Sequence, residues 1–158
     1  MMTAYLWLKM LHVFAALWVA VSAFGGSVLR ASMRRAPDLA ARMSILRAGI
    51  RIGVIFGLGG SIAVGLSGLA LAMTDPVYFK MRWVHASIGL WLLLLGLNIF
   101  LLAPRARRLL AAGEASLAAG APTDELKRLA ANPVPPYLAE LPAIAVVLFV
   151  LLMVLKPF

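Results

Sequence analysis

The stretch Tyr5-Leu6-Trp7-Leu8-Lys9-Met10-Leu11-His12-Val13 opens the first long apolar segment of the chain and places two ionisable side chains in it. Lys9 and His12 are three residues apart, so they share one face of a helix. Ionisable groups inside a membrane helix are costly, and they usually mark a functional site that has a partner. His85 is the other histidine of the chain and therefore the first candidate for that partner.

The composition is that of an integral membrane protein. The chain has 158 residues, of which 63% are apolar and 13% charged, whereas soluble domains have about half and a quarter. A helix needs roughly 20 residues to cross a ~30 Å hydrocarbon core, and four apolar runs reach or nearly reach this length. They cover residues 5–29, 52–73, 83–103 and 137–155. The sequence predicts an all-α fold, with residues 1–158 forming a single four-helix transmembrane bundle.

The net charge of +9 is unevenly distributed, which predicts the topology. The second connection contains only Lys80 and Arg82, whereas the first and third connections hold most of the basic residues: Arg30, Arg34, Arg35, Arg42, Arg47, Arg51, Arg105, Arg107, Arg108, Lys127 and Arg128. By the positive-inside rule the first and third connections are cytoplasmic and both termini lie outside. The positive charge then sets the orientation in the membrane and attracts the lipid bilayer, and it does not indicate binding to nucleic acid. The expected location is a bacterial inner membrane, crossed several times.

Local patterns add detail to the connections and to the second helix. The arginine-rich stretch before residue 52 is expected to start helix 2 below the membrane surface. Between Pro104 and Pro136 we expect two short surface helices on the cytoplasmic interface, the first ending at Gly120 and the second capped by Thr123. Helix 2 carries a small-xxx-small pattern that predicts close helix contact; it consists of Gly53, Gly57, Gly60, Ser61, Val64 and Gly68.

The two histidines are the best candidates for chemistry. Cysteine is absent, which excludes disulfides, iron–sulfur clusters and covalent haem attachment. Helices 1 and 3 both descend from the outer side, so His12 and His85 are expected at similar depths. Imidazole is a common axial ligand of haem iron, and helix bundles build such sites between facing helices. We therefore predict His12 and His85 as cofactor and metal ligands, with Lys9 as a cation for a haem propionate. Small residues beside them, Ala15, Ala16, Gly89 and Gly96, would leave room for a macrocycle.

Several alternatives remain open at this point. Each histidine can be an interfacial residue bonded to a carbonyl or water, and Lys9 a snorkelling anchor. Glu140 is expected to pair with loop arginines. Copper handling would use the histidines with Met10, Met73 and Met81. A non-enzymatic accessory subunit of a larger membrane complex would use the glycine-rich helix 2 as a docking face.

Four short motifs carry a resemblance to a known family. Trp7-Leu8-Lys9-Met10-Leu11-His12, followed by Trp18, is similar to the first helix of the four-helix, haem-binding bacterial protoporphyrinogen IX oxidases. Trp83-Val84-His85-Ala86 resembles the Trp-Leu-His-Ala segment of their third helix. Ala139-Glu140-Leu141-Pro142 and the terminal Lys156-Pro157-Phe158 resemble the Asn-Glu-x-Pro start of their last helix and their Lys-Pro-Phe end.

This resemblance implies a haem b protein in which His12 is the axial ligand. It implies an oxidoreductase that oxidises protoporphyrinogen IX in porphyrin biosynthesis and passes electrons to quinone or a respiratory-chain partner. The family's lysine after the third-helix motif is Ser87 here, its asparagine is Ala139, and Arg30 is a loose equivalent of its arginine after helix 1. A divergent paralogue is therefore an alternative, since copper-resistance D-type membrane proteins share the Lys-x-x-His opening. A homo-oligomer or a larger complex remains open.

Overall fold

The computed structural model describes residues 2–156, with the side chains of residues 4–156, and this part of the chain is helical without strands. The elements are α1 (Met2–Arg35), α2 (Leu39–Ile52), the π-helical η1 (Gly53–Gly59), α3 (Gly60–Met73), the 3₁₀-helical η2 (Pro76–Lys80), α4 (Arg82–Leu97), the π-helical η3 (Asn98–Leu102), α5 (Ala103–Ala119), α6 (Asp124–Ala131) and α7 (Pro136–Leu155).

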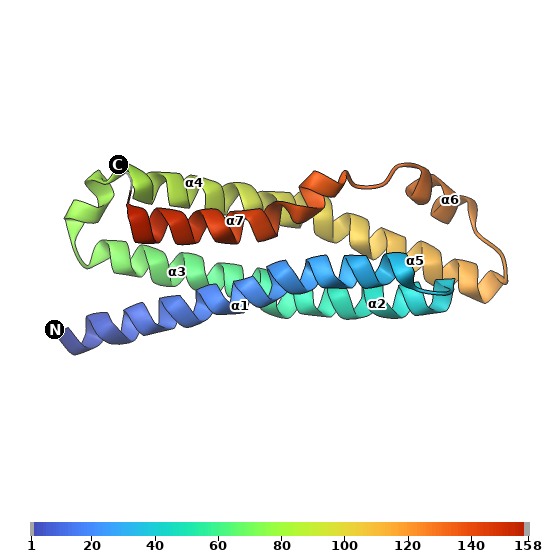
Figure 1. The fold of residues 1–158 in the computed structure, drawn as a ribbon, viewed down its shortest axis with the longest axis horizontal. Coiled ribbons are helices and arrows are strands. Elements are labelled where there is room, and N and C mark those ends of the chain that lie inside the picture. The colour runs from blue at the N-terminus through green and yellow to red at the C-terminus, as the bar shows by residue number, and fades with distance from the viewer. Residues whose placement is uncertain (1, 157–158) are drawn as a thin grey trace.

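Four continuous helices are long and apolar enough to cross a membrane, which confirms the predicted four-helix bundle. They cover Ala4–Arg35, Leu39–Met73, Arg82–Ala119 and Pro136–Leu155. The start of α1 and the end of α7 lie at the same end of the molecule, and α2, α5 and α6 form the other end (Figure 1). All four helices expose large apolar side chains, as a lipid-facing surface requires.

The helices are longer than their apolar runs. The helix predicted at residues 52–73 begins at Leu39, and the one predicted at 83–103 continues to Ala119. The second of these passes Pro104, which the sequence suggested as the start of a connection. The π-helical η3 precedes this proline, and there the Ala103 N–H donates to the Asn98 carbonyl. The wider π turn shifts the carbonyls that a proline ring would otherwise meet, so the helix continues.

Glycines bring the α2–η1–α3 helix close to its neighbours, as the small-residue pattern predicted. A Cβ at Gly57 would lie 2.8 Å from Ser22 Oγ, and a Cβ at Gly60 would lie 3.0 Å from Val19 Cγ2, both on α1. On another face, Gly65 accommodates the Trp91 ring of α4. Trp91 Nε1 donates to the Ser61 carbonyl over 3.0 Å. This helix therefore packs against both α1 and α4.

An ion pair joins α7 to α1 at the arginine-rich end of the bundle. Arg30 Nη2 lies 2.8 Å from Glu140 Oε2, and Arg30 Nε donates to Glu140 Oε1 over 3.1 Å. Ser27 Oγ donates to the same carboxylate. The expectation that Glu140 pairs with a loop arginine is confirmed, and the partner is Arg30, which the helical extension of α1 carries.

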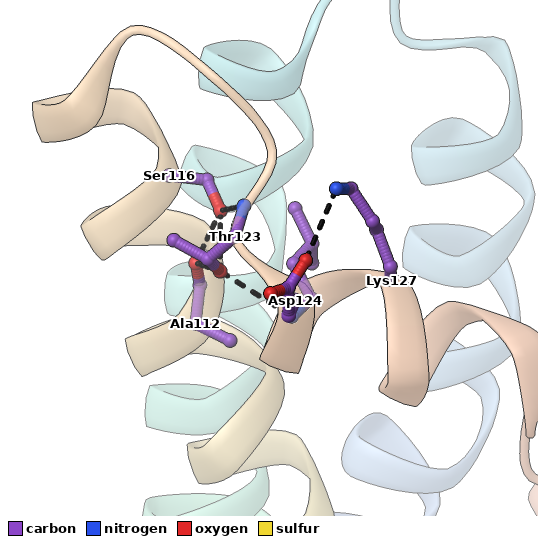
Figure 2. A network of polar contacts seen from close by, with 6 residues as sticks. Ala112, Ser116, Thr123, Asp124 and Lys127 are labelled. Carbon is purple, nitrogen blue, oxygen red and sulfur yellow. Dashed lines mark hydrogen bonds and ion pairs between the residues drawn. The ribbon is translucent and has the colours of Figure 1, made fainter.

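Helices α5 and α6 correspond to the two expected surface helices, but α5 does not stand alone. It continues the axis of α4 and packs along α2, where Gly113 faces Met43. The turn to α6 is built on Ser116, whose hydroxyl accepts from Thr123 N–H over 3.0 Å (Figure 2). Thr123 Oγ1 in turn accepts from Leu126 N–H over 3.3 Å, which confirms Thr123 as the N-cap of α6.

Candidate functional site

His12 lies at the contact between α1 and α3, and its side chain is half-buried. Its Nδ1 is 3.1 Å from Ser67 Oγ. The Ser67 hydroxyl donates its proton to the Ala63 carbonyl over 2.6 Å, so its oxygen is left to accept from His12. Because Nδ1 then carries the proton of the neutral imidazole, Nε2 carries the basic lone pair.

This arrangement is the one that metal-binding histidines adopt. Such a histidine donates one ring N–H to a fixed acceptor, which sets the tautomer and the ring orientation, and it coordinates through the other nitrogen. Ser67 is 5% exposed and is the fixed acceptor here. The Val64 carbonyl lies 3.2 Å from Ser67 Oγ.

Gly68 provides the space for the His12 ring. A Cβ at this position would lie 2.8 Å from His12 Cε1, 3.3 Å from Nδ1 and 3.7 Å from Nε2. The first of these separations is too short for a real side chain, so the imidazole needs a glycine next to Ser67. Of the two ring nitrogens, Nε2 is the one farther from this Cβ position.

His85 lies elsewhere, near the start of α4, and its side chain is exposed. Its Nδ1 donates to the Met81 carbonyl of its own helix over 3.1 Å. The neighbouring Trp83 and Ser87 are buried, whereas Gly89, one turn further along, has open space around it. Helix α4 packs on α3 and α7, and α1 packs on α3 and α7. Within the described residues no hydrogen bond joins the two histidines, and each is held by a different helix.

Lys9 is exposed and lies one turn nearer the start of α1 than His12. The same end of the bundle is held by polar and aromatic contacts. A hydrogen bond with Tyr5 raises the pKa of Tyr78, which lies in η2. The Tyr78 and Trp83 rings meet edge to face with centroids 6.4 Å apart. Lys156 Nζ lies 5.8 Å from the Trp83 ring centroid. These contacts join α1, η2, α4 and the end of α7 near Lys9.

Two hollows of the structure do not have His12 in their lining. One, of about 190 Å³, is lined by leucines, Ile144 and Ala145 of α4 and α7. The other, about 420 Å³ and more open, lies along Trp7, Leu8, Met10, Leu11 and Phe14 of α1. Over residues 4–156, no group of three His, Asp or Glu side chains is placed to hold a metal ion. An imidazole whose other ring nitrogen is hydrogen-bonded has the donor chemistry of an axial haem ligand.

Ser67 and Gly68 are the site residues that the sequence interpretation missed. Gly68 was counted only as part of a packing pattern, and Ser67 was not considered. A comparison of depth along the two apolar runs identifies both residues. His12 lies seven residues after Tyr5, where the first run begins, and Ser67 lies six residues before Met73, where the second run ends. In antiparallel neighbours these positions are level.

Comparison with known proteins identifies a family. A family model described as "Predicted integral membrane protein (DUF2269)" matches residues 6–157. No curated protein and no solved structure matches the chain.

Proposed function

Since the chain belongs to the DUF2269 family of integral membrane proteins, we propose that it is a membrane redox protein that binds one b-type haem through His12. The observation that carries the proposal is the 3.1 Å contact between His12 Nδ1 and Ser67 Oγ, whose hydroxyl donates to the Ala63 carbonyl. With that proton engaged, Nδ1–H donates to Ser67 and Nε2 is the basic nitrogen. A bound haem supplies a one-electron iron couple whose potential depends on the axial ligand and on burial.

The residues around His12 have distinct parts in this proposal. Ser67 orients the imidazole and prevents the other tautomer. Gly68 allows the ring to lie against the α3 backbone. Lys9, one helical turn away and exposed, offers a positive charge at the outer side, where it would pair with a carboxylate of the cofactor.

His85 is the candidate for a second ligand, and the structure gives it less support. Its Nδ1 is also bound, to the Met81 carbonyl, so its Nε2 is likewise basic. However, it lies on the exposed side of α4, a helix that packs on α3 and α7. We therefore propose His12 as the essential ligand and His85 as dispensable for haem retention.

The reaction follows from the resemblance and is a separate, finer proposal. Oxidation of protoporphyrinogen IX with transfer of electrons to quinone would make this chain an enzyme. Position 87, which holds lysine in the family it resembles, is a buried serine bonded to the Trp83 carbonyl over 2.9 Å. The reaction needs its own test: porphyrin fluorescence with added quinone, comparing the loaded wild type with His12→Ala.

The visible spectrum of the purified protein tests haem binding. The chain is expressed with ample haem supply, purified in mild detergent and recorded oxidised and dithionite-reduced. We expect a Soret band and reduced α and β bands of a b-type haem. His12→Ala should lose them, whereas His85→Ala should keep the haem. A wild-type preparation without a Soret band would contradict the proposal. A Soret band that is retained in His12→Ala would also contradict it.

A pair of serine variants separates the role of Ser67 from a general packing effect. Ser67 and Ser87 are 5% and 6% exposed, and each donates to the carbonyl four residues earlier. Only Ser67 of the two contacts His12. Ser67→Ala should shift the reduced spectrum and lower haem occupancy severalfold, while Ser87→Ala should leave both unchanged. Equal effects of the two variants would remove Ser67 from the site.

A further inference from the structure

The seam between α2 and α5 carries an unbalanced positive charge. Arg47 of α2 lies 2.5 Å from Glu114 of α5, in an exposed ion pair across this seam. Arg51 is four residues further along α2 and Arg107 is seven residues earlier on α5. Both spacings keep a side chain on roughly the same face of its helix. Arg51 and Arg107 therefore extend the face of the Arg47–Glu114 pair, and both are exposed.

A glycine contact shows that these arginines are level with each other. Gly113 of α5 faces Met43 of α2, and the two helices are antiparallel neighbours. Six residues from Met43 along α2 is position 49, and six residues back from Gly113 along α5 is Arg107. Arg51 lies half a turn beyond position 49, so it is at nearly the same height as Arg107.

The same contacts place this level at a membrane surface. A Cβ at Gly49 would lie 3.5 Å from Leu29 Cδ1 of α1, next to Arg30, which binds Glu140 in the first turns of α7. Helix α7 has 20 residues, about the length that crosses the hydrocarbon core. Its start therefore marks the edge of the core, where the phosphates of the lipid headgroups begin.

The acidic residues of this end are already engaged. Glu140 binds Arg30, Glu114 binds Arg47, Asp124 binds Lys127 and Glu125 binds Arg128. Asp38 accepts from the Ala41 N–H at the start of α2. Within residues 4–156 no carboxylate is left for Arg51 and Arg107, although both lie where a lipid phosphate would be.

We propose that Arg51 and Arg107 form a binding site for the phosphate of an anionic phospholipid on the α2–α5 seam. Two guanidinium groups on neighbouring helices at the headgroup level match the charge and the hydrogen-bonding geometry of a phosphate. The lipid would bridge the two helices one turn above the Arg47–Glu114 pair and hold the seam closed at the membrane surface.

Lipid titration of the purified, delipidated chain in detergent, followed by native mass spectrometry, tests this site. The probes are phosphatidylglycerol, phosphatidylcholine and inorganic phosphate. We expect phosphatidylglycerol to bind at least about tenfold more tightly than phosphatidylcholine. The double variant Arg51→Gln/Arg107→Gln should bind it about 30-fold more weakly, because each surface arginine contributes about 1 kcal/mol toward an anionic lipid and 1.4 kcal/mol is tenfold.

A second double variant provides a matched control. Arg35→Gln/Arg42→Gln removes two other exposed arginines that make no ion pair within the described residues, and these lie further from the core edge. It should change binding less than threefold. Equal losses in the two double variants, or no loss in the first, would overturn the site.

Two further measurements keep the test decisive. If the glutamine pair does not fold, Arg51→Lys/Arg107→Lys keeps the charge but loses the planar guanidinium groups, and we expect about three- to tenfold weaker binding. The proposal would be overturned if this lysine variant bound phosphatidylglycerol as tightly as the wild type does and bound phosphatidylcholine equally well. Inorganic phosphate bound with the same dependence on both arginines would assign the seam to a free anion and would also overturn the lipid site.

Discussion

At the scale of single residues, the most specific feature is the contact of His12 with Ser67 and Gly68. The hydroxyl fixes which ring nitrogen is protonated, and the glycine leaves space for the ring. A histidine that merely filled lipid-facing space would need neither. The two α3 residues therefore distinguish a held histidine from an incidental one, and both can be tested by small substitutions.

Gly68→Ala should displace the His12 ring, because the added Cβ would be 2.8 Å from Cε1. We expect haem occupancy to fall about tenfold or more and the protein to lose about 1–3 kcal/mol of stability through overpacking. The absorbance ratio of the Soret band to 280 nm and a thermal melt measure the two effects.

Gly89→Ala is the matched control for this change. Gly89 is also a helical glycine, and a Cβ there would meet nothing within 4 Å. The haem occupancy and the melting temperature of Gly89→Ala should stay at the wild-type values or rise slightly, since alanine favours helix formation. A loss of haem as large as that of Gly68→Ala would argue against a specific contact at Gly68.

At the scale of elements, two polar contacts add to the packing between helices. The Arg30–Glu140 pair ties α7 to α1 through a hydrogen bond from Nε and an ion-pair contact from Nη2 of the same guanidinium group. The Ser116–Thr123 contact fixes the turn between α5 and α6. Each lies at the arginine-rich end, where the helices leave the membrane and lipid no longer confines them.

The Arg30–Glu140 pair should show positive coupling in a double-mutant cycle. Arg30→Gln, Glu140→Gln and the double variant would be compared by unfolding in detergent, and we expect a coupling energy of about 1 kcal/mol, the upper range for partly exposed pairs. Lys127→Gln, which breaks an exposed pair within α6, should be neutral. Additive effects of the two α1–α7 variants would show that the pair does not join the helices.

Ser116→Ala should loosen α6 without disturbing the membrane helices. The variant leaves Thr123 N–H without its acceptor, and the loss of such a bond in a part-buried site costs about 1–3 kcal/mol. Hydrogen exchange should therefore speed up about tenfold or more from Thr123 to Ala131 and stay unchanged in α3. Unchanged exchange in α6 would mean that other contacts, such as the bond from Arg105 Nη2 to the Leu129 carbonyl, fix this turn without Ser116.

At the scale of the whole molecule, the positive-inside rule predicts that the arginine-rich end is cytoplasmic and that both termini are outside. The structure confirms that the start of α1 and the end of α7 lie together, opposite α2, α5 and α6 (Figure 1). Helices of 32, 35 and 38 residues are about 48–57 Å long, well beyond a ~30 Å core. They extend past the level of α7 at that end, so α2, α5 and α6 form a small helical region outside the membrane.

Single cysteines test this orientation, because the chain has none of its own. Val77→Cys lies in η2 between α3 and α4, and Ala118→Cys lies near the end of α5; both positions are exposed. An impermeant maleimide should label Val77→Cys in intact spheroplasts and Ala118→Cys only after the membrane is opened. The reverse pattern would invert the topology.

The sequence alone determined the number of membrane helices, their order and the grouping of charge at one end. These follow from hydrophobic runs and from the distribution of arginines along the chain, both of which are local properties. The start of α7 was predicted within one residue because Pro135 and Pro136 end the connection before it. The small-residue pattern of helix 2 also predicted close helix contact, and Gly57 and Gly60 of that pattern meet α1.

Only the tertiary structure decided which side chains meet. Pairing His12 with His85 rested on equal depth, but depth does not specify which way a helix face points. Helix α1 turns His12 toward Ser67 and Gly68, while His85 lies on the exposed side of α4. Likewise, the apolar runs could not show that α5 continues α4, since a π turn before Pro104 makes this possible. The rotation of each helix about its own axis depends on all of its neighbours, and this rotation determined the site.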